Sequence, residues 1–167
     1  MSVIDWKKFH RFQEKPGWCG PAAIQMVLLT AGIEKSQAEI AEAVQKEWWG
    51  TTQDITIAYL SRFFDGLNFQ SGSSLRDVKQ HLEKGRVVIA DWWDDLDKGE
   101  ADGHYSLVAN VDLESSRITL ADPSRSRKGI WEMGVREFEK RWYDYLDENR
   151  RIKVERWILW IDPKSKL

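Results

Sequence analysis

The only cysteine of the chain, Cys19, stands in a sequence that suits a nucleophilic thiol. Gly20 and Pro21 follow it, and an apolar run then extends over residues 22–31. This pattern predicts a buried helix with Cys19 at its first turn, where unpaired backbone amides carry partial positive charge and favour the thiolate. A thiolate attacks carbonyl carbons, so the expected chemistry is acyl transfer. A buried structural cysteine is the alternative interpretation.

A histidine far downstream is the expected general base. His104 lies between Gly103 and an apolar segment that begins at Tyr105, a position from which it could face the start of the helix. The two other histidines are its competitors. We expect His81 to be solvated on a polar helix, and His10 to lie at the surface or to serve packing.

An acidic residue is needed to orient the imidazole. Asp122 follows an apolar strand-like segment and precedes Pro123. A carboxylate there can accept the second N–H of the ring, fix its tautomer and stabilise its charged form. A turn aspartate before proline is the alternative role for this residue. Asn110 and Asp112 are the competing candidates for the site.

Two more side chains near Cys19 suit a site for peptides. Gln13 lies six residues upstream, and its amide could join the backbone N–H of Cys19 in stabilising an oxyanion. A surface glutamine is the alternative. Trp18 directly precedes Cys19 and could form an aromatic wall, as could the pairs Trp48–Trp49 and Trp92–Trp93, although core packing is the commoner role for large aromatics.

Two kinds of structure must bring these residues together. Helices are expected over residues 22–31, from a capping box at Ser36–Glu39, over 52–63 and over 74–85. Strands are expected over 86–93, 104–113, 117–121, 129–133 and 151–161, with a helix over 135–146. The fold class is therefore α+β: one domain over 1–167, with a helical half of about 1–85 whose central buried helix packs on a C-terminal antiparallel sheet of about 86–167.

Composition excludes several classes of function. The net charge of -2, from 25 basic and 27 acidic residues, gives no reason to expect a nucleic acid partner. Membrane insertion is not expected, because no apolar stretch approaches the roughly 20 residues that span a bilayer. One cysteine cannot build an internal disulfide or a cysteine-based metal site, so we expect no metal and a reducing, cytoplasmic location.

Taken together and in order, these motifs resemble those of the papain-like cysteine peptidases. Gln13 with the run from Trp18 to Ala22, then Gly103-His104-Tyr105, then Ala121-Asp122-Pro123 look most like the double-glycine leader peptidase branch. The resemblance implies a papain-like fold in which Cys19 is the nucleophile, His104 the base, Asp122 the orienting acid and Gln13 the oxyanion donor. It also implies a peptide or protein substrate held near Trp18, Gly20, Gly103 and Tyr105, no cofactor, and possible association with a transporter.

Some features depart from that pattern or stay open. Trp18 stands where such leader peptidases often have a small or acidic residue, and the acidic stretch 91–102 is an extension before His104. That stretch is either a solvated turn or a negative rim that favours cationic substrate segments or keeps His104 protonated. The basic stretches 125–128 and 150–153 are expected to be solvated.

Two functions are weighed against each other. The first is a stand-alone cysteine peptidase, or a related acyl-transfer enzyme such as an amide-forming or isopeptide-cleaving one. The second is a catalytically silent module of the same fold that binds a leader or partner peptide. The presence of all four motif residues favours the enzyme.

Overall fold

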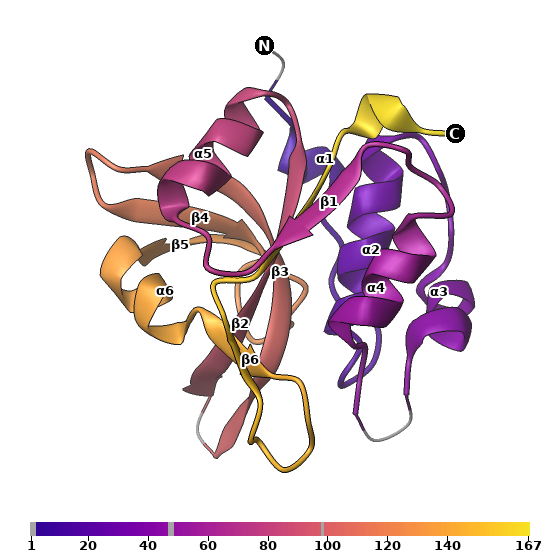
Figure 1. Ribbon diagram of the computed structural model, residues 1–167. Coiled ribbons are helices and arrows are strands. Elements are labelled where there is room, and N and C mark those ends of the chain that lie inside the picture. The colour runs from indigo at the N-terminus through magenta and orange to yellow at the C-terminus, as the bar shows by residue number, and fades with distance from the viewer. Residues whose placement is uncertain (1–2, 47–48, 98) are drawn as a thin grey trace.

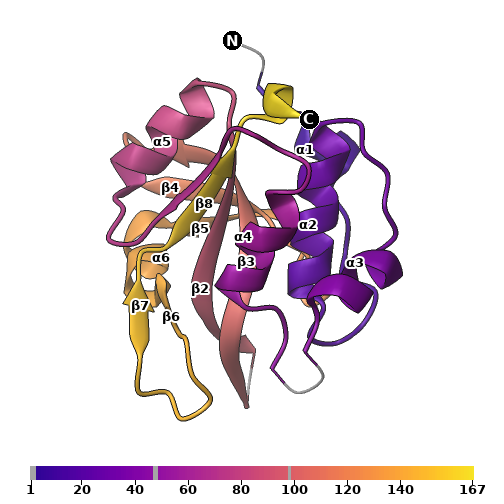
Figure 2. The same cartoon turned by 45° about the vertical axis from the view of Figure 1, so that its right-hand side comes forward.

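The computed structural model describes residues 3–46, 49–97 and 99–167. Trp48, of the first tryptophan pair, and Lys98, in the acidic stretch, lie outside the described residues. A central antiparallel sheet separates two groups of helices (Figures 1 and 2). Among the described residues, no helix has the length and apolar character needed to cross a membrane.

One group of four helices covers the face of the sheet on which the apolar segment 22–31 packs. It consists of α1 (Trp6–Phe9), α2 (Cys19–Thr30), α3 (Gln37–Val44) and α4 (Gln53–Leu60). Both views show α2 between α3 and the sheet (Figures 1 and 2). Most of α2 is buried, as expected for a helix with polar side chains at only Gln25 and Thr30.

The sheet contains six strands in the order β1-β8-β2-β3-β4-β5, and every neighbouring pair is antiparallel. The strands are β1 (Leu67–Gln70), β2 (Val87–Asp97), β3 (Glu100–Asp112), β4 (Arg117–Ala121), β5 (Ile130–Gly134) and β8 (Ile158–Ile161). Two helices, α5 (Leu75–Glu83) and α6 (Val135–Arg141), cover the second face. A separate hairpin is formed by β6 (Tyr143–Tyr145) and β7 (Lys153–Glu155), and a 3-10 turn (Pro163–Ser165) follows β8.

Alternation along β2 builds a core on each side of the sheet. Val87 and Ile89 belong to the cluster under α2, while Val88, Ala90 and Trp92 belong to the cluster under α5 and α6. Successive side chains of a strand point to opposite faces, so a strand covered on both sides reads as a continuous apolar run. This explains why the segment from Val87 to Trp93 contains one acidic residue only, Asp91.

The predicted α+β fold is confirmed, and several element boundaries differ from those expected. Stretch 1–85 also contains β1, which pairs with β8 at the edge of the sheet. The expected helix 135–146 stops at Arg141 and continues as β6, and the expected strand 151–161 is divided into β7 and β8. The capping box forms in full at Ser74 and Asp77, whereas at Ser36 only the Ser36 side chain caps the helix.

Candidate active site

Cys19 is the first residue of α2, and its thiol is half-buried. Trp18 occupies the N-cap position but provides no side-chain hydrogen bond, and the first turn carries no acidic residue. The backbone N–H groups at this end of the helix therefore keep their partial positive charge for a thiolate or an oxyanion. The absence of a side chain at Gly20 lets Thr51 pack against the first turn of α2, because a β-carbon on Gly20 would collide with the Thr51 side chain.

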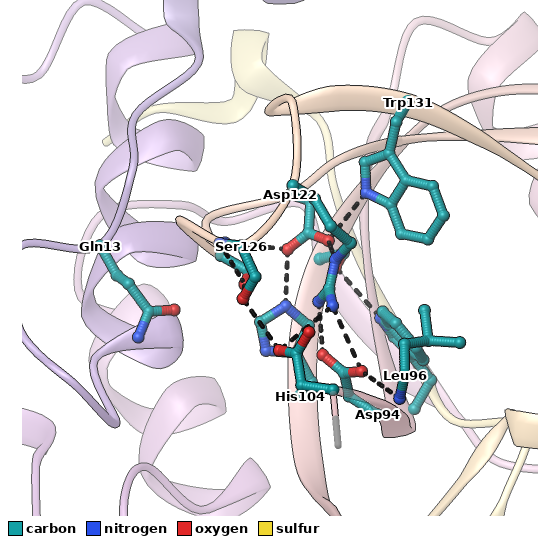
Figure 3. Close-up of polar contacts among 12 residues, drawn as sticks. Gln13, Asp94, Leu96, His104, Asp122, Ser126 and Trp131 are labelled. Carbon is teal, nitrogen blue, oxygen red and sulfur yellow. Dashed lines mark hydrogen bonds and ion pairs between the residues drawn. The ribbon is translucent and has the colours of Figure 1, made fainter. Parts of the chain in front are cut away.

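The two candidates for base and acid, His104 and Asp122, meet because their strands pair. His104 lies on β3, Asp122 directly follows β4, and the two strands are neighbours in the sheet. His104 Nε2 and Asp122 Oδ1 are 2.6 Å apart, and both side chains are buried (Figure 3). A carboxylate accepts hydrogen bonds, so Nε2 donates and Nδ1 takes no part in the bond to Asp122. Cys19 lies near enough to the ring to raise the pKa of His104.

Four donors hold the carboxylate of Asp122. Its Oδ1 accepts from His104 and from the backbone N–H of Ser124, at 3.0 Å. Its Oδ2 accepts from Arg127 Nε and from Trp131 Nε1, each at 2.8 Å (Figure 3). The carboxylate is therefore both charge-balanced and fixed in orientation.

These contacts set the charge states of the pair. Burial alone would lower the pKa of His104, but the charge and hydrogen bond of Asp122, together with Cys19, raise this pKa to about 10. Burial alone would raise the pKa of Asp122, yet His104 and Arg127 hold it well below its ordinary value. The site therefore favours an imidazolium beside an ionised carboxylate at neutral pH.

Arg127 corrects one expectation. The basic stretch 125–128 was expected to be solvated, but the Arg127 side chain is only 10% exposed and also pairs with Asp94 on β2. The acidic stretch that contains Asp94 is not a turn: β2 runs to Asp97 and β3 starts at Glu100. The solvated-turn interpretation is therefore wrong for most of this stretch, because its residues pair across the two strands of an antiparallel ladder.

Gln13 is attached to the same loop through its backbone. Its N–H donates to the Pro123 carbonyl at 2.8 Å, and its carbonyl accepts from Arg125 Nε at 2.7 Å. Its side-chain amide donates to the Lys15 carbonyl at 3.1 Å and leaves its second N–H free of any contact within the described residues. Figure 3 shows Gln13 apart from the contacts of Asp122, on the side of the helices.

Gln37, the residue that holds this segment, was not identified by sequence reasoning. It is buried, its amide donates to the Phe12 carbonyl, and its oxygen accepts from the Glu14 backbone N–H, both at 2.9 Å. A third bond of 2.9 Å joins Gln37 to Gln25 on α2. The residues on either side of Gln13 are therefore fixed by one side chain, and that side chain is fixed by the helix that carries Cys19.

The competing candidates lie elsewhere or have other roles. His10 Nε2 contacts the Asp122 backbone carbonyl at 2.7 Å and supports the loop from outside the site. His81 stacks on Trp160, with ring centroids 4.1 Å apart. Asn110 and Asp112 are exposed, and the Asp112 carboxylate caps its own turn by accepting from the backbone of Glu114 and Ser115.

A cleft of about 830 Å³ opens beside Cys19. Of the residues expected at the substrate, Gly103 and Tyr105 line it, whereas Trp18 and Gly20 do not. The Trp18 ring packs under Lys15, whose Nζ lies 4.9 Å from the ring centroid, and the Tyr105 hydroxyl donates to the Thr51 carbonyl at 2.9 Å. The cleft walls come from four places: the segment that leads into α2, the segment between α3 and α4, the β2–β3 pair and the β6–β7 hairpin.

Comparison with known proteins identifies the family. The model of the Peptidase_C39 like family matches residues 4–148, so the chain belongs to this family. The chain is 31% identical over 136 residues to an uncharacterized protein of Methanothermobacter marburgensis, covering 76% of this chain and 83% of that protein. A protein of Methanothermobacter thermautotrophicus is 30% identical over 113 residues, covering 65% and 67%.

Solved structures share the fold at lower identity. The peptidase domain of Streptococcus ComA, a bi-functional ABC transporter, has a TM-score of 0.64 and 18% identity over 92% of this chain and 98% of that one. A putative C39-like peptidase from Bacillus anthracis has a TM-score of 0.66 and 13% identity, and the match covers 97% of this chain and 98% of that one. A double glycine motif protease from an AMS/PCAT transporter, in complex with the leader peptide, has a TM-score of 0.58 and 14% identity. This match covers 90% of this chain and 89% of that one. The predicted family resemblance is thereby confirmed.

Proposed function

We propose that the protein is a cysteine peptidase, or a closely related acyl-transfer hydrolase, in which Cys19, His104 and Asp122 form the catalytic triad. The observation that carries the proposal is the buried contact of His104 with Asp122, together with the effect of Cys19 on the same imidazole. Its Nε2 lies 2.6 Å from the Asp122 carboxylate, and its pKa is raised by Asp122 and Cys19 against the effect of burial. Membership of the Peptidase_C39 like family supports the same chemistry.

The reaction follows from the charge states of these groups. The Cys19 thiolate attacks the carbonyl carbon of a peptide bond, and the carbonyl oxygen becomes an oxyanion. The backbone N–H of Cys19 and the amide of Gln13 donate to that oxyanion. His104, as imidazolium, gives its proton to the departing amine and leaves a thioester on Cys19. Neutral His104 then takes a proton from water, which hydrolyses the thioester and restores the thiolate–imidazolium pair.

Reactivity of the single thiol tests the proposal. The protein is treated at pH 7 with a limiting amount of iodoacetamide, and labelling of Cys19 is followed by mass spectrometry. We expect fast labelling in the native protein and labelling at least tenfold slower in a His104→Ala variant, because the imidazolium stabilises the thiolate. His81→Ala is the matched control, since this histidine stacks on Trp160 away from the site.

The same experiment separates the enzyme from the silent binding module. Circular dichroism establishes that His104→Ala is folded before the rates are compared. Native labelling no faster than that of the urea-unfolded protein would contradict the proposal and favour the module. Fast labelling without turnover of any peptide in a library would mean that the reactive thiol acts on an acyl donor other than these peptides.

The substrate is proposed to be a peptide or protein. The neighbours described as a transporter's peptidase domain and as a protease bound to a leader peptide support a peptide in the cleft. Association of this chain with a transporter stays a prediction. So does contact between Trp18 and the substrate, because Trp18 lies outside the lining of the cleft.

A further inference from the structure

The cleft contains two carboxyl groups that the proposed mechanism does not use. Asp91, on β2, is 2% exposed, and its Oδ2 accepts from Gln53 Nε2 at 2.8 Å. Its Oδ1 is buried and has no donor among the described residues. The carboxyl of Asp144, on β6, meets Asp91, and both residues line the cleft. A buried oxygen without a donor at the wall of a cleft is free to accept a hydrogen bond from a bound group.

The two carboxyl groups can lie close together because one of them is protonated. Burial, followed by the effect of Asp144, raises the pKa of Asp91 well above its ordinary value. Asp91 is therefore the protonated member of the pair. Neither residue has an ion-pair partner within 4.0 Å in the described part of the chain. The nearby Arg150 lies over the Trp93 ring, 4.8 Å from its centroid.

The groups that face Asp91 come from every element packed around it. They are Asp144 on β6, Gln53 on α4, Cys19 on α2 and Tyr105 on β3. None of them is a permanent cation. A thiolate at Cys19 would add a further negative charge near Asp91, and this charge raises the pKa of Asp91.

Gly103, next to His104, leaves space for the Asp144 carboxyl group in the cleft. A β-carbon on Gly103 would collide with the Asp144 carboxyl group. Gly103 directly precedes His104, so the carboxyl pair is held close to the reacting groups rather than at a distant rim. The lining also contains aromatic side chains, further acidic residues and one basic residue: Trp49, Trp93, Tyr145, Asp102, Asp147, Glu148 and Arg150.

We propose that this cleft binds a positively charged side chain, lysine or arginine, of the peptide substrate next to the scissile bond, and that Asp91 and Asp144 are the residues that select it. The inference rests on the proposed function and deepens it. On binding, the ammonium or guanidinium group takes the place of the proton on Asp91, which leaves for the solvent, so one cation enters as one proton departs. The alkyl stem lies along the aromatic walls.

Matched peptides test the selection. A library of acetylated hexapeptides carries lysine or norleucine at each position in turn, and kcat/KM is measured for each member at pH 7. At one position near the cleaved bond, we expect lysine to exceed norleucine at least tenfold. In Asp144→Asn that ratio falls towards one, whereas in Asp65→Asn, an exposed residue outside the cleft with the same change in charge, it is unchanged. Asp91→Asn is a second variant with the same expected loss of selectivity.

Calorimetry with Cys19→Ala measures binding without turnover. The selected lysine peptide should bind at least tenfold more tightly than its norleucine counterpart, and titrations in phosphate and Tris buffers should show net release of protons on binding. Turnover without a lysine or arginine preference would overturn this inference and leave the proposed function standing. Preferential binding of the lysine peptide without turnover of any peptide would overturn the proposed function and leave this inference standing. Equal binding of both peptides and no turnover would overturn both.

Discussion

At the scale of single residues, the most heavily constrained group is the carboxylate of Asp122. Four donors converge on it, two of them from Arg127 and Trp131, and His10 contacts its backbone carbonyl. A carboxylate held this firmly fixes the plane of the imidazole that donates to it. The geometry of His104 is therefore prepared before any substrate arrives.

Replacing that carboxylate by an amide should separate catalysis from folding. Asp122→Asn keeps the shape of the side chain but removes the charge that stabilises imidazolium, so we expect turnover to fall by roughly 10²- to 10⁴-fold. Steady-state kinetics on the best library peptide measures the loss, and circular dichroism establishes the fold. Asp112→Asn is the matched control because Asp112 is exposed. Retained activity in Asp122→Asn, with loss in Asp112→Asn, would assign the third residue of the triad to Asp112.

Titration of His104 reports directly on the same contact. The ring should stay protonated through neutral pH and lose its proton only at about 10, where the effect of Asp122 and Cys19 is overcome. In Asp122→Asn the desolvation of the ring is no longer opposed by that charge, so the pKa should drop by several pH units. Nitrogen-detected NMR of the imidazole follows both titrations. An unchanged titration in the variant would mean that Asp122 does not control the charge of His104.

The main candidates for the site could be selected because their chemical types are rare and their local sequence is distinctive. Cys19 has no competitor in the chain, and the His and Asp candidates were selected by their order and by their places at strand ends. Gln37 and Arg127 could not be found in this way. Their roles depend on contacts with residues far away in the sequence, and a single glutamine or arginine in a polar segment looks like any surface residue.

At the scale of elements, the start of α2 depends on a segment with little regular structure. Residues 12–14 lie between α1 and α2 and are held by Gln37 and by the loop after β4. The position of the Gln13 amide relative to Cys19 is therefore set by side-chain hydrogen bonds rather than by a helix or a sheet. Such an arrangement is sensitive to the loss of one polar side chain.

Substitution of Gln37 tests this dependence. Gln37→Met keeps much of the volume but removes three hydrogen bonds, so we expect a loss of roughly 2–4 kcal/mol in unfolding free energy. If Gln37 positions Gln13, kcat should also fall while KM changes little. Urea denaturation and steady-state kinetics provide the two measurements, and Gln80→Met, at an exposed position of α5, is the control. A loss of stability with unchanged kcat would limit Gln37 to a structural role.

Secondary structure was easiest to predict where one element has one clear signal. Strand β4 has the predicted bounds, residues 117–121, since five residues of alternating burial stand between turn signals. The short β1 and the division between β7 and β8 were missed, because pairing with distant strands, not local propensity, defines them. The hairpin of β2 and β3 is longer than expected, since backbone pairing continues to Asp97 and Glu100 and Arg127 balances the charge of Asp94.

At the scale of the whole molecule, three sets of buried charges make stability depend on pH in opposite directions. The pKa of Asp122 is lowered in the folded state, so its contribution is present above the ordinary carboxyl range and is lost as pH falls. The pKa of His104 is raised from 6.5 to about 10, so its contribution is present below 6.5 and is lost as pH rises through 10. Asp91 and Asp144 have raised pKa values and also lose their contribution as pH rises.

The unfolding free energy should therefore decline on both sides of a maximum that lies at weakly acidic pH. Urea denaturation from pH 3 to pH 10 measures the profile. Asp144→Asn removes one of two facing carboxyl groups and leaves a single charge, so we expect the decline above neutral pH to become shallower. A steeper alkaline decline in this variant would show that Asp144 stabilises the fold through its charge.

The single thiol beside an imidazolium has a consequence for oxidative conditions. Peroxide converts an accessible thiolate into a sulfenic acid, which is normally rescued by a second thiol. This sequence offers no second cysteine, so an internal disulfide cannot form and recovery depends on an external reductant such as glutathione. Inactivation by hydrogen peroxide should be reversible by added glutathione at first and become permanent with longer exposure, as sulfinic acid accumulates.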